Sequence, residues 1–137
     1  MVNNTSIRWN WIKGMYIYTI IGAGGYGLMI LVFPNIIKLI FNLPDQAETI
    51  LGITGSVYCA FGLLSILGIR SPLKFLPVLL LQLTYKIVWF IGVIIPLLVS
   101  GRISLFALPY VIIFATYIIG DLIAIPFPYV FAKTTSK

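Results

Sequence analysis

Four long apolar stretches dominate the sequence, and each is long enough to cross a membrane. They cover about residues 15–33, 50–68, 75–99 and 104–125. At about 1.5 Å per residue, the third stretch exceeds the roughly 30 Å of a bilayer's hydrocarbon core. Only 9% of the residues are charged, against roughly 25% in soluble globular domains, so the chain cannot cover a water-facing surface. We expect one all-α domain over residues 1–137, a bundle of four antiparallel transmembrane helices.

The segment between the first two stretches is bounded by prolines and too short to span. Residues 34–44 (PNIIKLIFNLP) combine apolar side chains with Lys38 and Asn42, which predicts a short helix lying in the membrane interface. After it, Asp45 and Glu48 have the spacing of an N-cap residue and an acid three positions later. This pattern predicts that a helix begins near Asp45.

Small residues on the first two stretches predict close packing between these helices. Residues 22–27 (GAGGYG) match the GxGxxG pattern of dinucleotide-binding loops, but they lie inside a predicted span. We therefore interpret them as a helix-packing surface, because small residues let helix backbones approach closely in lipid. The second stretch carries two neighbouring small-residue stripes, Gly52, Ser56 and Ala60 on one, and Gly55 and Cys59 on the other. In the third stretch, Pro96 predicts a kink.

The distribution of basic residues predicts the orientation of the chain. With four spans, both termini share one side, together with Arg8, Lys13, Arg70, Lys74, Lys133 and Lys137. The opposite side holds Lys38 and Arg102, offset by Asp45 and Glu48. The positive-inside rule then places both termini in the cytoplasm of a multi-pass protein of the plasma (inner) membrane. The net charge of +6 thus reflects membrane topology, and we expect the lipid bilayer rather than nucleic acid as partner.

A lysine lies almost at the centre of the third stretch, where a charge is costly. Gln82, Tyr85, Lys86 and Trp89 share one helix face by their i, i+3, i+4, i+7 spacing. Asp121 is the only other charge inside a predicted span. Counted from the connection between the last two spans, the two charges differ in depth by about 7–8 Å.

We therefore predict that Lys86 and Asp121 meet inside the bundle, directly or through water, with polar and aromatic groups around them. An unpaired charge in hydrocarbon costs at least ~2.5–3.5 kcal/mol on insertion scales, which favours pairing. The candidate ligand-binding residues are Lys86, Asp121, Gln82, Tyr85, Trp89, Tyr117 and Tyr58. Two other interpretations stay open: the pair only fixes the register of two helices, or Asp121 lies in the interface.

Three functions are consistent with this pattern. The first is binding of a lipophilic small molecule, quinone-like or isoprenoid-like, in an intramembrane pocket. The second is a small transporter, or an oligomer that conducts protons or a solute. The third is an accessory subunit of a membrane complex. An enzyme is less favoured, because the chain has no histidine and one cysteine, which excludes Ser-His-Asp and Cys-His sites. We expect no metal and no cofactor.

The layout of the spans resembles a known group of membrane proteins. The motifs FPNIIKLIFNLP, GSVYCAFGLLSILGIRSP, LLQLTYKIVWF and YIIGDLIAIPFPY are similar in arrangement to small bacterial four-helix proteins of the DoxX-like group. That resemblance implies quinone or thiol redox chemistry and assigns no site residue. Sterol-isomerase-like four-helix proteins are also similar in layout; their sites use buried carboxylates, for which only Asp121 is available here.

Overall fold

The computed structural model describes residues 6–134 of the chain, and within that range it contains helices and no strand. The helical elements are α1 (Trp9–Thr19), the π-helical turn η2 (Ile20–Gly24), α2 (Gly25–Val32), α3 (Pro34–Ile40), α4 (Glu48–Arg70), α5 (Leu76–Trp89), the π-helical turn η3 (Phe90–Ile94), α6 (Ile95–Val99), α7 (Ala107–Ala124) and α8 (Phe127–Phe131). The all-α prediction is confirmed for the described residues.

Four of the helical segments are long and apolar enough to cross a membrane. They are Trp9–Val32, Glu48–Arg70, Leu76–Val99 and Ala107–Ala124. The chain is therefore a multi-pass membrane protein. The first helix begins six residues before the predicted apolar stretch, because backbone hydrogen bonding continues through polar residues that hydropathy does not count. The last begins at Ala107, which places Pro109 in its first turn, where a missing N–H is tolerated.

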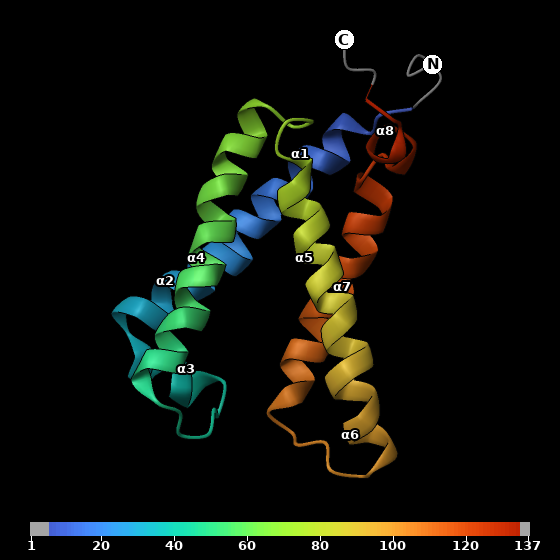
Figure 1. Cartoon of the computed structure of the whole chain (residues 1–137). Helices are drawn as coiled ribbons and strands as arrows, with labels where there is room; N and C mark the ends of the chain where they lie inside the picture. Colours follow the sequence, from blue (N-terminus) through green and yellow to red (C-terminus); the bar gives the residue numbers. More distant parts are fainter. Residues whose placement is uncertain (1–5, 135–137) are drawn as a thin grey trace.

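The two ends of the molecule carry different parts of the chain (Figure 1). Both described chain ends lie at one end of the molecule, together with the connection between α4 and α5. The short helix α3 and the connection between α6 and α7 lie at the other end. The helices α1 and α2 pack against α4, α5 packs against α7, and α1 also contacts α7. Side chains from α1, α2, α4, α5 and α7 can therefore meet in the middle of the molecule.

The predicted packing of the first two spans through small residues is confirmed. A Cβ on Gly62 would lie 2.6 Å from the Cα of Gly24, and a Cβ on Gly55 would lie 3.2 Å from the carbonyl oxygen of Gly27. The stripe that begins with Gly55 thus faces α2. The parallel stripe through Gly52 faces away, since a Cβ there would meet nothing within 4 Å.

The start of α4 differs from the prediction. The helix begins at Glu48 with Ala47 at its N-cap, and no side chain caps it, so the prediction that Asp45 caps this helix was wrong. Residues 43–47 are not helical, because a residue before proline is disfavoured in helical conformation and Pro44 keeps the chain extended. Glu48 still places a carboxylate in the first turn, where the helix dipole favours it.

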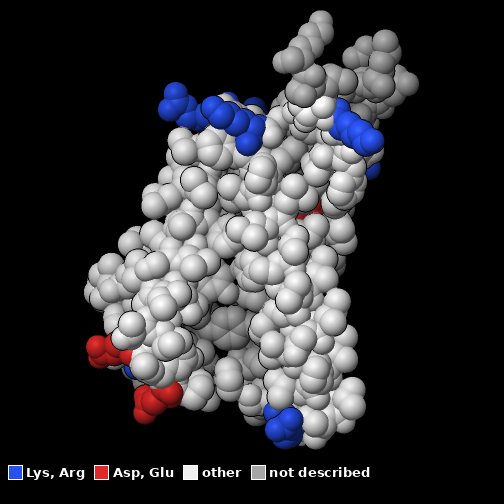
Figure 2. All heavy atoms as spheres, viewed as in Figure 1, with Lys and Arg blue, Asp and Glu red and all other residues white. Residues whose placement is uncertain are grey.

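Charged residues gather at the two ends of the molecule, and uncharged residues dominate the surface between them (Figure 2). Large apolar side chains are exposed along every span, for example Ile21, Leu63, Leu81 and Ile112. The buried core is correspondingly small and includes Ile12, Tyr16, Leu79 and Ala124 among its members. This distribution is typical of helices whose outer faces contact lipid.

Candidate functional site

The ammonium group of Lys86 lies in the interior, on α5, with the residue only 1% exposed. It donates a hydrogen bond to the hydroxyl of Tyr85 at 2.8 Å. Three aromatic rings surround it, with the nitrogen 4.2 Å from the ring centroid of Tyr85, 4.5 Å from that of Tyr117 and 4.9 Å from that of Phe114. Cation–π attraction to these rings compensates part of the cost of taking the charge out of water.

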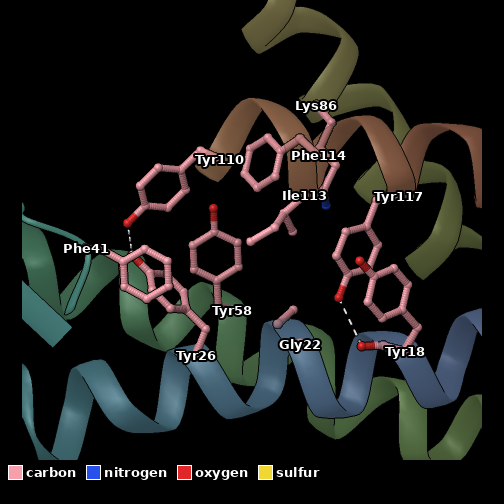
Figure 3. Close-up of a pocket in the computed structure, with 11 residues that line it drawn as sticks. Tyr18, Gly22, Tyr26, Phe41, Tyr58, Lys86, Tyr110, Ile113, Phe114 and Tyr117 are labelled. Atoms are coloured by element: carbon pink, nitrogen blue, oxygen red, sulfur yellow. Dashed lines mark hydrogen bonds between the residues drawn. The ribbon is translucent and has the colours of Figure 1, made fainter. Parts of the chain in front are cut away.

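A cavity of about 200 Å³ opens beside this ammonium group. Figure 3 shows the lysine nitrogen pointing toward its interior, with tyrosine rings on both sides. It is lined by Tyr18, Gly22, Ala23, Tyr26, Phe41, Tyr58, Lys86, Tyr110, Ile113, Phe114 and Tyr117. We call it the lysine cavity, because Lys86 is the only charged residue among those that line it.

The tyrosines of the lysine cavity are held by one another. The rings of Tyr18 and Tyr117 stack with centroids 4.1 Å apart and planes 4° from parallel. The hydroxyl of Tyr117 donates to the backbone carbonyl of Tyr18 at 2.9 Å, and the hydroxyls of Tyr26 and Tyr110 are hydrogen-bonded to each other. These contacts connect α1 and α2 to α7 (Figure 3). The cavity wall is therefore held together by contacts between its own residues.

A second cavity, of about 280 Å³, adjoins the first. Its lining includes Tyr85 and Trp89 from α5, and it shares four aromatic residues with the lysine cavity, namely Tyr26, Tyr58, Tyr110 and Phe114. We call it the tryptophan cavity. In Figure 2 the surface is hollowed between α4 and α5, and residues of both helices line this cavity. A wall of shared aromatic rings thus separates two neighbouring spaces inside the bundle.

The carboxylate of Asp121 is fully buried and belongs to a separate polar network. The side-chain amide of Gln82 donates to it, with the nitrogen 3.0 Å from Oδ2 and 3.4 Å from Oδ1. The amide oxygen of Gln82 accepts from the hydroxyl of Thr19 at 3.1 Å, and that hydroxyl also lies 2.8 Å from the carbonyl of Met15. Gln82 therefore links α1 and α7 through α5.

Lys86 and Asp121 are both buried between α5 and α7, but they have separate partners. The two charges are close enough to act on each other electrostatically, yet no direct ion pair joins them in the described part of the chain. The two charged residues have separate partners because they lie at different depths. Gln82 lies one helical turn from Lys86 and level with Asp121, so its amide reaches the carboxylate. A link through water stays a prediction.

The predicted site residues therefore divide into three groups. Lys86, Tyr58 and Tyr117 line the lysine cavity, and Tyr85, Trp89 and again Tyr58 line the tryptophan cavity. Gln82 and Asp121 line neither of these two cavities. Their contribution to a site is to fix the positions of α1, α5 and α7.

Sequence reasoning missed the residues that the first span contributes. Tyr18, Gly22 and Tyr26 line the lysine cavity at intervals of four residues. In a regular α-helix, two such intervals rotate a side chain by about 80° away from the first. The wider π-helical turn Ile20–Gly24 lies between them and reduces this drift. The eight-residue interval between Tyr18 and Tyr26 was the available signal, but only the π-helical turn brings both tyrosines onto one face.

Comparisons with protein-family models, with curated proteins and with solved structures find no match to this chain.

Proposed function

We propose that the protein binds a lipophilic small molecule with a polar head, quinone-like or isoprenoid-like, in the lysine cavity. One observation carries this proposal: an ammonium group inside a membrane span points into a space lined by aromatic rings (Figure 3). A buried charge in a span is costly and is retained mostly where it serves function. An apolar cavity with few convergent polar groups is the usual form of a small-molecule site.

The size of the cavity supports a ligand with a ring-sized head. A cavity of roughly 150 Å³ in another protein accommodates benzene, so about 200 Å³ is sufficient for a single ring or a compact polar group. It is smaller than the roughly 300–1,000 Å³ typical of whole ligand sites. The remainder of the ligand would extend into the tryptophan cavity or the surrounding lipid.

We further propose that the four spans form an antiparallel bundle in the plasma (inner) membrane with cytoplasmic termini. Lys and Arg residues gather at the end of the molecule that carries both described chain ends (Figure 2), and the positive-inside rule supports this orientation. Lys137, which entered the same prediction, lies outside the described residues. At the other end, Leu39 and Ile40 of α3 are 82% and 65% exposed, which suits a helix lying in the interface.

The resemblance to DoxX-like proteins stays a prediction, and the site supports one part of what it implies. Cys59 is half-buried and unpaired, and it does not line the lysine cavity. A site for a quinone-like ring therefore agrees better with this arrangement than thiol chemistry does.

The test compares two neighbouring isoleucines of α7. Ile113 lines the lysine cavity, whereas Ile112 is 64% exposed and does not line it. Ile113→Trp should fill part of the lysine cavity and lower the amount of lipophilic molecule that mass spectrometry detects after gentle detergent extraction by about tenfold or more. Ile112→Trp should retain the ligand, because the added ring faces outward.

Other outcomes separate the alternative functions. If no lipophilic molecule is retained by the unmodified protein and none raises its thermal stability, the binding proposal is wrong. Flux of protons or solute through liposomes that Lys86→Met abolishes would favour a transporter. A stoichiometric protein partner in the extract would favour an accessory subunit.

A further inference from the structure

The ammonium group of Lys86 has unused hydrogen-bonding capacity. It carries three N–H donors, and one of them is used by Tyr85. The nearest buried carboxylate, Asp121, takes its hydrogen bonds from Gln82. The other N–H groups of Lys86 face aromatic rings and the lysine cavity. A buried cation without a contacting anion is one of the most costly arrangements in a protein interior.

We propose that the ligand of the lysine cavity is an acidic lipophile whose carboxylate pairs with Lys86. This inference rests on the proposed function and narrows its ligand class. A carboxylate placed in the cavity would accept hydrogen bonds from the free N–H groups and place a negative charge in contact with the ammonium group. A neutral quinone would accept a hydrogen bond but leave the ammonium group without an anion in contact.

The charge of the cavity favours a single negative charge on the ligand. Lys86 is the only charged residue in the lining, so one carboxylate balances it. A phosphate monoester carries about −1.5 to −2 charges at neutral pH and would leave part of its own charge buried without a partner. The rings of Phe114 and Tyr117 would contact the carbons next to the carboxylate, as apolar walls do for an alkyl chain.

The experiment measures binding of dodecanoate and of its neutral methyl ester to the purified full-length protein in nanodiscs. The two probes share the same chain and differ in charge. The unmodified protein should bind dodecanoate at least about tenfold more tightly than the ester, because hydrogen bonds between charged groups are the strong ones. Lys86→Met should remove this preference, and Lys86→Arg should keep it.

A matched control excludes attraction to surface charge. Lys74 is exposed in the connection between α4 and α5, and Lys74→Met should leave the preference for dodecanoate unchanged. The thermal unfolding of ligand-free Lys86→Met is measured as well, because the substitution also removes the cation that acts on the buried carboxylate of Asp121. That measurement also shows whether the variant is folded.

The outcomes distinguish this inference from the proposed function. If the unmodified protein binds the ester as tightly as dodecanoate, the acidic-ligand inference is overturned and lipophile binding stands. If Lys86→Met is folded and keeps the full preference, the inference is also overturned. If neither probe nor a neutral quinone binds, the inference and the proposed function both fail. If Lys86→Met does not fold, the comparison of the two probes on the unmodified protein decides whether the acidic-ligand inference stands.

Discussion

At the scale of single residues, the amide of Gln82 is the hydrogen-bond donor that the structure provides to the buried carboxylate of Asp121. Gln82→Leu keeps an apolar side chain of similar length but removes this donor. We expect a loss of about 1–3 kcal/mol in the free energy of unfolding, because a buried polar group then loses its partner. Reversible unfolding in mixed micelles measures the change.

The double variant Gln82→Leu with Asp121→Leu is the control for this pair. When both partners become apolar, no unsatisfied group remains, so the double variant should be more stable than Gln82→Leu alone. If the loss in the free energy of unfolding of the double variant equals the sum of the losses of the two single variants, the two side chains are not coupled.

Residue spacing predicted much of the polar interior. The i, i+3, i+4, i+7 pattern placed Gln82 and Lys86 on one helix face, and counting from the last connection placed Lys86 and Asp121 about 7–8 Å apart in depth. Spacing did not predict which group each of these side chains would hydrogen-bond. Lys86 hydrogen-bonds the hydroxyl of its neighbour Tyr85 rather than contacting Asp121, which depends on side-chain conformations that spacing does not determine.

At the scale of helices, α2 and α4 depend on glycine for their close approach. A Cβ on Gly27 would lie 2.5 Å from the carbonyl oxygen of Gly55 and 2.9 Å from the backbone carbon of Tyr58. Gly27→Ala should therefore lower the free energy of unfolding by about 1–3 kcal/mol, because neither backbone can move without separating the helices. Thermal unfolding of the purified protein checks this.

Gly25 provides the matched control on the same helix. A Cβ there would meet nothing within 4 Å, so Gly25→Ala should be neutral, or stabilising by up to about 1 kcal/mol through its better helix propensity. Equal losses in the two variants would contradict a specific contact at Gly27.

Small-residue stripes predicted which helices pack, but not which stripe makes the contact. Gly52 and Gly55 lie on adjacent faces of α4, and sequence spacing treats them alike. The rotation of α4 about its axis turns Gly55 toward α2 and Gly52 away from it. The proline at position 96 predicted an irregular helix, and the π-helical turn Phe90–Ile94 precedes it. The π-helical turn in the first span has no proline to announce it, so the tyrosine face of that span could not be predicted.

At the scale of the whole molecule, the cavities arise from pairings between distant parts of the chain. Residues of α1, α2, α4, α5 and α7 line the lysine cavity. The order of apolar stretches predicts four spans, but it does not predict which spans lie apart and leave a cavity between them. The hydroxyl pair of Tyr26 and Tyr110 joins residues 84 positions apart, a contact that no local pattern indicates.

The proposed orientation makes a prediction for the two connections at opposite ends of the molecule. Ser71 lies in the connection after α4, and Ser100 in the connection after α6; both are exposed. In a Cys59→Ala background, each serine is replaced by cysteine. A membrane-impermeant maleimide should label Ser100→Cys in intact spheroplasts and Ser71→Cys only after permeabilisation, because the six-to-two excess of basic residues keeps the Ser71 side in the cytoplasm. Labelling of Ser71→Cys alone would reverse the orientation, and labelling of both would contradict their separation by the membrane.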